Sequence, residues 1–277
     1  MSLRTAVSNS TASHSPAPPV DPRSRLPAFI SRFLGYRSGP APYAPLPFFP
    51  FNQLHHIPLQ VETWFFGFIG AFVSILLIEA VMQFATPFRG TDAPLIVVSF
   101  GASAVLVFGV VESPLAQPQN LVMGQVVSAF VGVALTKLFC TGDAAYTPDL
   151  DARRFEGGYF TNGALSMATA MLAQQLFGIT HPPAGATSLS AATTPQILHL
   201  GWMYLLLVLV SSLIMLGWAL IINNLGRRRY PAYWIKSDGI FAIIGKQVQA
   251  RRQRRIEARR QTREGKGAEE GRAEGQP

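Results

Sequence analysis

The stretch WMYLLLVLVSSLIMLGWALII, residues 202–222, decides the class of fold. It contains no charged residue, and its only polar pair is Ser211-Ser212. A helix needs about 20 predominantly apolar residues to cross the hydrocarbon core of a bilayer. Apolar runs of this length are rare in soluble proteins. The stretch therefore predicts a transmembrane helix.

Similar runs fill the chain upstream of this stretch. Their residues do not alternate between polar and apolar, as the strands of a transmembrane β-barrel would. We therefore expect an all-α, polytopic membrane bundle with about four full spans and two shorter, buried motif helices. The predicted helical segments are 62–84, 94–110, 119–140, 158–179, 183–192 and 199–225.

The charges divide the chain into three parts. The net charge of +8 arises entirely from residue 227 onward, because residues 1–226 hold nine basic and nine acidic residues. Residues 1–61 are rich in Pro and Ser and are predicted to be a disordered tail. The bundle is expected over 62–226. Residues 227–277 are expected to form a basic tail, helical over 240–262 and disordered from about 265.

The basic residues at both ends also predict the topology. Arginines next to membrane spans favour the cytoplasmic or equivalent side. Both termini are therefore expected on that side, which requires an even number of crossings. Five arginines before residue 40 are also typical of an organelle transit peptide, although the many prolines there argue against an amphipathic helix. An organelle envelope therefore stays open as the location.

Two short motifs lie between the long runs and resemble each other. The segment SFGASAV, residues 99–105, aligns with PAGATSL, residues 183–189, at an offset of 84. The order of long, short and long segments thus occurs twice, which suggests an internal repeat. Paired segments rich in Gly or Pro mark the substrate sites of many transporters. A chance match of small residues is the alternative.

The second motif begins at Pro183, the second of two prolines that follow His181. Pro182 favours an extended His181, and Pro183 suits the first turn of a helix. The start of such a helix attracts anions through its N–H groups, and nearby hydroxyls add donors. The predicted substrate-binding residues are Ser99, Gly101, Ser103, His181, Gly185 and Thr187. A simple proline kink is the alternative.

Together, THPPAGATSL, SFGASAVLVFG (99–109), SPLAQPQN (113–120) and the Asn-Asn of WALIINNLGRR resemble the HPP integral membrane family over roughly residues 60–230. This resemblance implies a compact helical bundle with a transport role, and plant members are associated with nitrite movement across plastid membranes. It also implies Arg where Gln119 stands and His where Gln125 stands. These two departures leave the substrate open.

Other polar residues in the apolar segments are further candidates. A charge at the centre of a span costs about 2.5–3.5 kcal/mol on insertion scales, so Glu79 is a candidate for proton coupling together with His181. A position near the membrane edge is the alternative for Glu79. Gln117 and Asn120 are candidates for lining a pathway, or they cap the next helix. No spacing of His and Cys predicts a metal site, and no cofactor is expected.

The motifs and the resemblance together favour a carrier of a small inorganic anion, which the resemblance implies to be nitrite-like, and proton coupling through Glu79 and His181 is a further hypothesis. A membrane scaffold whose basic tail binds anionic lipid or a protein partner is the alternative, and a homo-oligomer stays open. An intramembrane enzyme is disfavoured because no nucleophile elbow or HExxH motif occurs, although Ser99, Ser103 and His181 could supply a nucleophile and a base. Nucleic acid is not an expected partner, because the basic residues form a tail rather than a domain.

Overall fold

The computed structural model describes residues 21–84, 94–139, 161–236 and 239–273. Every regular element in these residues is helical, so the predicted all-α membrane bundle is confirmed. The α-helices are α1 (Ala28–Phe33), α2 (Leu59–Phe84), α3 (Ser99–Ala104), α4 (Gln125–Phe139), α5 (Asn162–Phe177), α6 (Pro182–Thr193), α7 (Pro195–Leu200), α8 (Met203–Ile222) and α9 (Ile240–Ala273). Short 3₁₀ or π segments are η1 (Pro22–Arg25), η2 (Phe51–His56), η3 (Val105–Gly109), η4 (Pro114–Ala116) and η5 (Asn120–Gly124).

Three helices in the described residues are long and apolar enough to cross a membrane. They are α2, the continuous helix Asn120–Leu138 formed by η5 and α4, and α8. The 26 residues of α2 extend about 39 Å, which exceeds a hydrocarbon core of about 30 Å. The fourth predicted span corresponds to α5, whose described part has 16 residues. Its predicted start at residue 158 lies outside the described residues.

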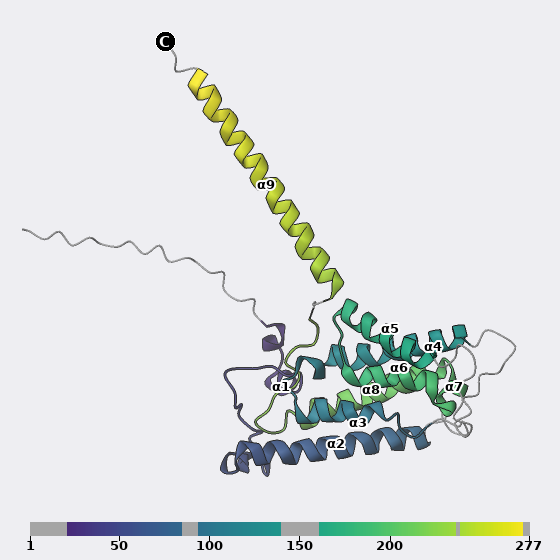
Figure 1. Ribbon diagram of the computed structural model, residues 1–277. Helices are drawn as coiled ribbons and strands as arrows, with labels where there is room; N and C mark the ends of the chain where they lie inside the picture. Colours follow the sequence, from purple (N-terminus) through teal and green to yellow (C-terminus); the bar gives the residue numbers. More distant parts are fainter. Residues whose placement is uncertain (1–20, 85–93, 140–160, 237–238, 274–277) are drawn as a thin grey trace, which may run out of the picture.

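The long helices pack in antiparallel pairs. Helix α5 packs against α4, and Gln174 bonds Ser128 while Asn162 bonds Thr136, so the two helices run in opposite directions. Helix α2 packs against α8, and Glu62 near the start of α2 contacts Arg227 just after the end of α8. Figure 1 shows α2 along one side of the bundle, with α5 on the far side from it.

Both motif helices are short, as predicted, and α6 is largely buried, whereas α3 differs from the prediction because Gly101, Ala102 and the following Val105 are exposed. Helix α6 has 12 residues, or about 18 Å, which is too short to cross a bilayer. His181 caps it in an extended conformation (φ −137°, ψ 99°), and the two prolines form its first turn. Helix α3 with η3 covers Ser99–Gly109 and packs against α6 and α2.

The order of long, short and long helices occurs twice, as α2–α3–α4 and α5–α6–α8. In this comparison α2 corresponds to α5, α3 to α6 and α4 to α8. When each helix is replaced by its counterpart, the observed pair α2 and α8 becomes α5 and α4, which also pack together. The same replacement converts the packing of α2 on α3 into that of α5 on α6. The correspondence is not complete, because α4 packs extensively on α6 while no such contact joins α8 to α3. The helix contacts therefore agree in large part with the predicted internal repeat.

The N-terminal segment differs from the predicted disordered tail. Over residues 21–58 it carries η1, α1 and η2, and the side chains of Tyr43 and Leu46 are buried. The backbone N–H groups of these two residues donate to the carbonyls of Arg227 and Leu225, at 3.1 and 3.2 Å. This order comes from contacts with the far end of the chain, which local composition does not reveal. Residues 1–20 lie outside the described residues.

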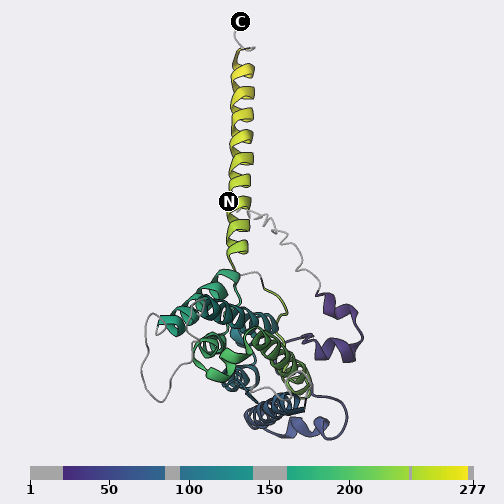
Figure 2. The same ribbon diagram turned by 90° about the vertical axis from the view of Figure 1, so that its right-hand side faces the viewer.

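The C-terminal region also differs from the expected tail. Arg228, Arg229 and Tyr230 are buried at the end of the bundle. The predicted basic helix over 240–262 is present as α9, but it continues to Ala273, beyond the predicted start of disorder at 265. The extra residues, GKGAEEGRA (265–273), combine Glu, Lys, Arg and Ala, which favour helices, with three glycines, which do not. Figures 1 and 2 both show α9 projecting away from the bundle.

Candidate functional site

A polar cluster lies between the two motif helices and α4. Its members are Ser99 and Ser103 on α3, Gln125 at the start of α4, Thr187 on α6 and His181, which caps α6. All five side chains are at most 2% exposed. Burying so many polar groups in an apolar bundle is stabilising only if they bond one another. Their hydrogen bonds therefore define the site.

The cluster is linked by hydroxyl groups and one amide. Ser99 Oγ lies 2.6 Å from Thr187 Oγ1, and Ser103 Oγ lies 2.8 Å from His181 Nε2. Gln125 joins the two pairs, since its Nε2 donates to Ser103 Oγ at 2.9 Å and its Oε1 accepts from the Thr187 hydroxyl. The four side chains of α3 and α6 are thus bridged by a single residue of α4.

The imidazole of His181 is held on several sides. The ring Nδ1 lies 2.9 Å from the carbonyl oxygen of Leu115, and the backbone N–H of His181 donates to Gln174 Oε1 at 2.7 Å. A carbonyl oxygen only accepts, so Nδ1 carries the hydrogen and Nε2 of the neutral ring accepts from Ser103. Gly124 allows this approach, because a Cβ there would lie 2.8 Å from the Cβ of His181.

The start of α6 offers fewer free donors than the sequence predicts. Pro182 and Pro183 carry no N–H group, and the N–H of Ala184 donates to the carbonyl of His181 at 2.9 Å. Of the N–H groups expected to attract an anion, that of Ala184 is therefore already paired, and attraction of an anion by those from residue 185 onward stays a prediction. The remaining polar groups of the site are the hydroxyls, the Gln125 amide and the imidazole.

The two glycines of the motifs lie outside the cluster. Gly101 is exposed on the opposite side of α3, and a Cβ built there would meet no atom within 4 Å. Gly185 is buried against Met167 of α5, at an ordinary contact distance of 3.7 Å from a built Cβ. The motif segments do approach each other as predicted, but through Ser99, Ser103, His181 and Thr187 rather than through the glycines.

The other predicted residues also occupy separate places. Glu79 is half-buried on α2 and lines a groove together with Gly101, which lies on the face of α3 opposite to Ser99 and Ser103. Gln117 is fully buried and donates to the carbonyls of Val111 and Ser113. Asn120 donates to the carbonyl of Thr180 at 2.7 Å. Gln117 and Asn120 therefore fasten loops in this structure.

Three residues of the site were not predicted as site residues. Gln125 stood out only as a departure from the resembling family. Gln174 holds the N–H of His181 and donates to Ser128, and Tyr204 of α8 donates to the carbonyl of Thr187 at 3.0 Å. A glutamine at position 174, inside an apolar run, was the available signal. Its partners lie in other segments, so the sequence alone did not connect them.

The pairing of Ser103 with His181 also resembles the nucleophile and base of a hydrolase. However, the Ser103 side chain is completely buried, and its oxygen already accepts from Gln125. In this arrangement neither a substrate nor an ion reaches this hydroxyl, so a reaction or the binding of an ion there requires the cluster to open. Among the described residues, no three His, Cys, Asp or Glu side chains lie close enough to hold a metal ion.

The fold and the buried cluster define a polytopic helical membrane protein with two central half-length helices. The chain belongs to the HPP transmembrane family, because residues 57–231 match the family description "HPP, transmembrane region". Both tails lie largely outside the match.

Two relatives come from Dictyostelium discoideum, and each is named only as a transmembrane protein. One is 34% identical over 179 residues, which cover 62% of this chain and 54% of the relative. The other is 36% identical over 178 residues, which cover 62% of this chain and 50% of the relative. The match thus spans about half the length of each relative. No solved structure gives a significant match.

Proposed function

We propose that this protein carries a small monovalent anion, nitrite-like, across a membrane together with a proton. The observation that carries the proposal is the hydrogen bond of 2.8 Å between Ser103 Oγ and His181 Nε2, inside the buried cluster. It places a titratable ring next to three hydroxyls and an amide at the centre of the bundle. These groups can solvate a small anion, and the ring can hold a proton.

The charge of the site supports a proton as the partner of the anion. None of the five clustered residues is a carboxylate, Lys or Arg. An anion entering such a site without a counter-charge would be strongly disfavoured. Protonation of His181 supplies that charge, and a second negative charge on the substrate would stay unpaired. The site therefore suits a monovalent anion better than a divalent one.

The arrangement of the halves supports transport. Ser99 of α3 meets Thr187 of α6, while Ser103 meets His181, so the two motif helices cross in opposite directions. Helices α2 and α8 are also antiparallel, as are α4 and α5. Inverted repeats with discontinuous helices meeting near the midplane are typical of secondary transporters.

The test is nitrite flux into liposomes that contain only the purified protein, measured across pH 5–8 with and without a pH gradient. We expect flux driven by an inward proton gradient. His181→Ala should reduce it at least roughly tenfold, because a hydrogen bond to a charged group contributes about 1.5–3 kcal/mol. The matched control is Ser212→Ala, since this buried serine bonds only Val208 of its own helix. Gradient-independent flux in the wild type would contradict proton coupling.

A non-transporting membrane module is the second candidate, and one observation favours it. The hydroxyls and amides of the cluster bond one another, as a purely structural network would. In this case the basic helix α9 would supply the function by binding anionic lipid or a protein partner. Correctly inserted protein that moves neither nitrite nor another monovalent anion would favour this candidate.

A further inference from the structure

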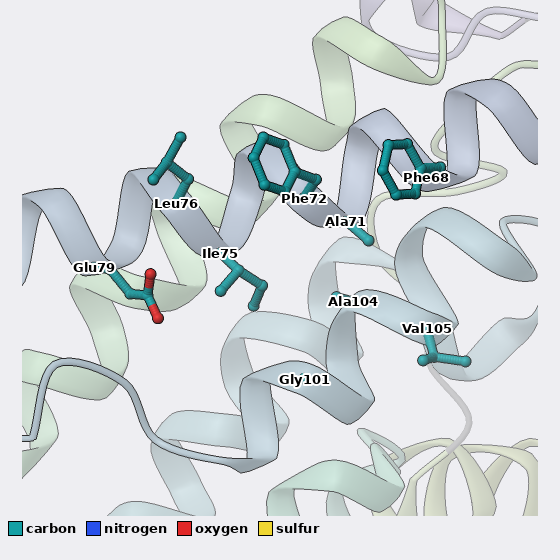
Figure 3. A pocket seen from close by; sticks show the side chains of 9 residues that line it. All are labelled: Phe68, Ala71, Phe72, Ile75, Leu76, Glu79, Gly101, Ala104 and Val105. Atoms are coloured by element: carbon teal, nitrogen blue, oxygen red, sulfur yellow. The ribbon is translucent and has the colours of Figure 1, made fainter.

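An open groove of about 430 Å³ runs between α2 and α3, on the side of α3 that faces away from the polar cluster. Phe68 and Phe72 of α2 form one wall, and their rings are nearly parallel, with centroids 6.2 Å apart. Gly101 and Ala104 lie on the α3 side. Figure 3 shows Ile75 and Glu79 projecting from α2 on the side where α3 lies. The groove has the size of a small-molecule site.

The groove is apolar except at one end. Glu79 lies 11 residues beyond Phe68 on α2, which corresponds to about 16 Å along the helix axis. Within the described parts of the chain, neither an ion pair nor a hydrogen bond joins the Glu79 carboxyl to another residue. A charged carboxylate at the edge of hydrocarbon is costly, and it requires a partner or a proton.

The missing side chain of Gly101 leaves the groove open. A Cβ built at this position would meet no atom within 4 Å. Residues on a helix are rotated by about 100° each, so Gly101 lies on the opposite face of α3 from Ser99 and Ser103. The groove and the polar cluster are therefore separate sites that share one short helix.

We propose that this groove binds a single-chain lipophilic amine from the membrane, with the ammonium group at Glu79 and the alkyl chain along Phe68, Phe72 and Ile75. Charge complementarity selects the amine, because among the described residues that line the groove the only charged side chain is the negative Glu79. An anionic amphiphile would be repelled by Glu79. The proposal does not depend on the transport of an anion.

The experiment measures binding of dodecylamine and dodecanol to the full chain in phosphatidylcholine nanodiscs at pH 7.5, with empty nanodiscs subtracted. We expect saturable, one-site binding of the amine, at least tenfold tighter than that of the alcohol. Glu79→Gln should remove this tenfold preference. Gly101→Leu should weaken both ligands at least tenfold by filling the groove.

The matched control is Gly217→Leu. Gly217 is also an exposed helical glycine with no atom within 4 Å of a built Cβ, but it lies on α8. The Gly217→Leu variant should bind both the amine and the alcohol as tightly as the wild type does. Equal binding of amine and alcohol to the wild type would overturn the proposal. Unchanged amine binding by Gly101→Leu, or by Glu79→Gln, would overturn it as well.

Discussion

The hydroxyl of Ser103 has a single proton and two acceptors within reach. These are Nε2 of His181 at 2.8 Å and the backbone carbonyl of Ser99 at 3.1 Å. When the ring is neutral, the proton points to Nε2. When the ring is protonated, Nε2 becomes a donor, and the hydroxyl can turn to the carbonyl without moving its oxygen. The cluster therefore accommodates both states of His181.

This geometry gives a prediction for Ser103→Ala in the flux assay. The variant removes the partner of Nε2, and the protonated ring then has no acceptor at that position. We expect the pH dependence of nitrite flux to shift toward lower pH, because a protonated ring without a partner forms less readily. Flux at saturating proton concentration should fall less than in His181→Ala. A pH profile identical to that of the wild type would contradict the role of this hydrogen bond.

Two neighbouring glutamines allow a prediction about stability. Gln174 is 3% exposed and bonds both the N–H of His181 and Ser128, whereas Gln175 is exposed on α5. Gln174→Ala should lower the free energy of unfolding by about 1–3 kcal/mol for each buried group left without a partner. Gln175→Ala should change it by less than about 0.5 kcal/mol. Thermal unfolding in detergent measures both, and equal midpoints would contradict the structure.

At the scale of helices, the apolar runs predicted the segments well and their ends less well. The length of an apolar run suffices to predict a helix where the run is long enough to cross a membrane. The predicted segment 199–225 instead begins inside α7, and α8 starts only at Met203. Gly201 separates the two helices with a φ of +52°, a conformation that is rare for other residues. In the sequence Gly201 stands among apolar residues, and it did not indicate that one helix ends and another begins there.

The contact between α4 and α6 depends on another glycine. A Cβ at Gly132 would lie 2.6 Å from the carbonyl oxygen of Ser188 and 2.8 Å from the Cβ of Ala191. Gly132→Val should therefore separate the helices and lower the free energy of unfolding by about 1–3 kcal/mol or more. Gly217→Val is the control, because it has open space around it. Equal unfolding midpoints for the two variants would show that α4 and α6 are not packed as closely at Gly132 as this structure has them.

At the scale of the molecule, the site could be predicted in part. Ser99, Ser103 and Thr187 were found together because each belongs to one of two similar motifs, and His181 because it stands just before the second motif. Gln125 and Gln174 come from other segments, and only folding places them beside His181. The aligned glycines were misleading, because equal spacing in sequence did not put both of them on the faces that meet.

The segment before α2 and the segment after α8 lie at the same end of the bundle, which agrees with the expected even number of crossings. Which side of the membrane they occupy stays a prediction. The side chain of Arg32 donates to the carbonyls of Asn224, Leu225 and Gly226, which follow α8. Burial lowers the pKa of Arg229 to about 10, so it stays charged at neutral pH, and it lies 5.1 Å from the ring centroid of Tyr43.

This end of the bundle determines how much of the C-terminus is dispensable. Tyr230 is fully buried and donates to the carbonyl of Ala116 at 2.7 Å. A chain that ends after residue 238 should therefore keep the unfolding midpoint of the full protein. A chain that ends after Arg229 loses Tyr230 and should unfold at a clearly lower temperature, because loss of a large buried aromatic costs about 3–5 kcal/mol. Equal midpoints would contradict this packing.

The bonds between the two ends also set an order for biosynthesis. Arg32 and Asn224 are 192 residues apart in the chain, and Glu62 and Arg227 are 165 apart. When a ribosome has delivered α2 to the membrane, the partner of the Glu62 carboxylate has not yet been translated. The Glu62 carboxylate must therefore stay in contact with water or lipid headgroups until α8 has been inserted and Arg227 has left the ribosome. Closure of this end is therefore a late step of assembly, and a nascent chain arrested before residue 227 should leave Arg32 and Glu62 accessible to solvent.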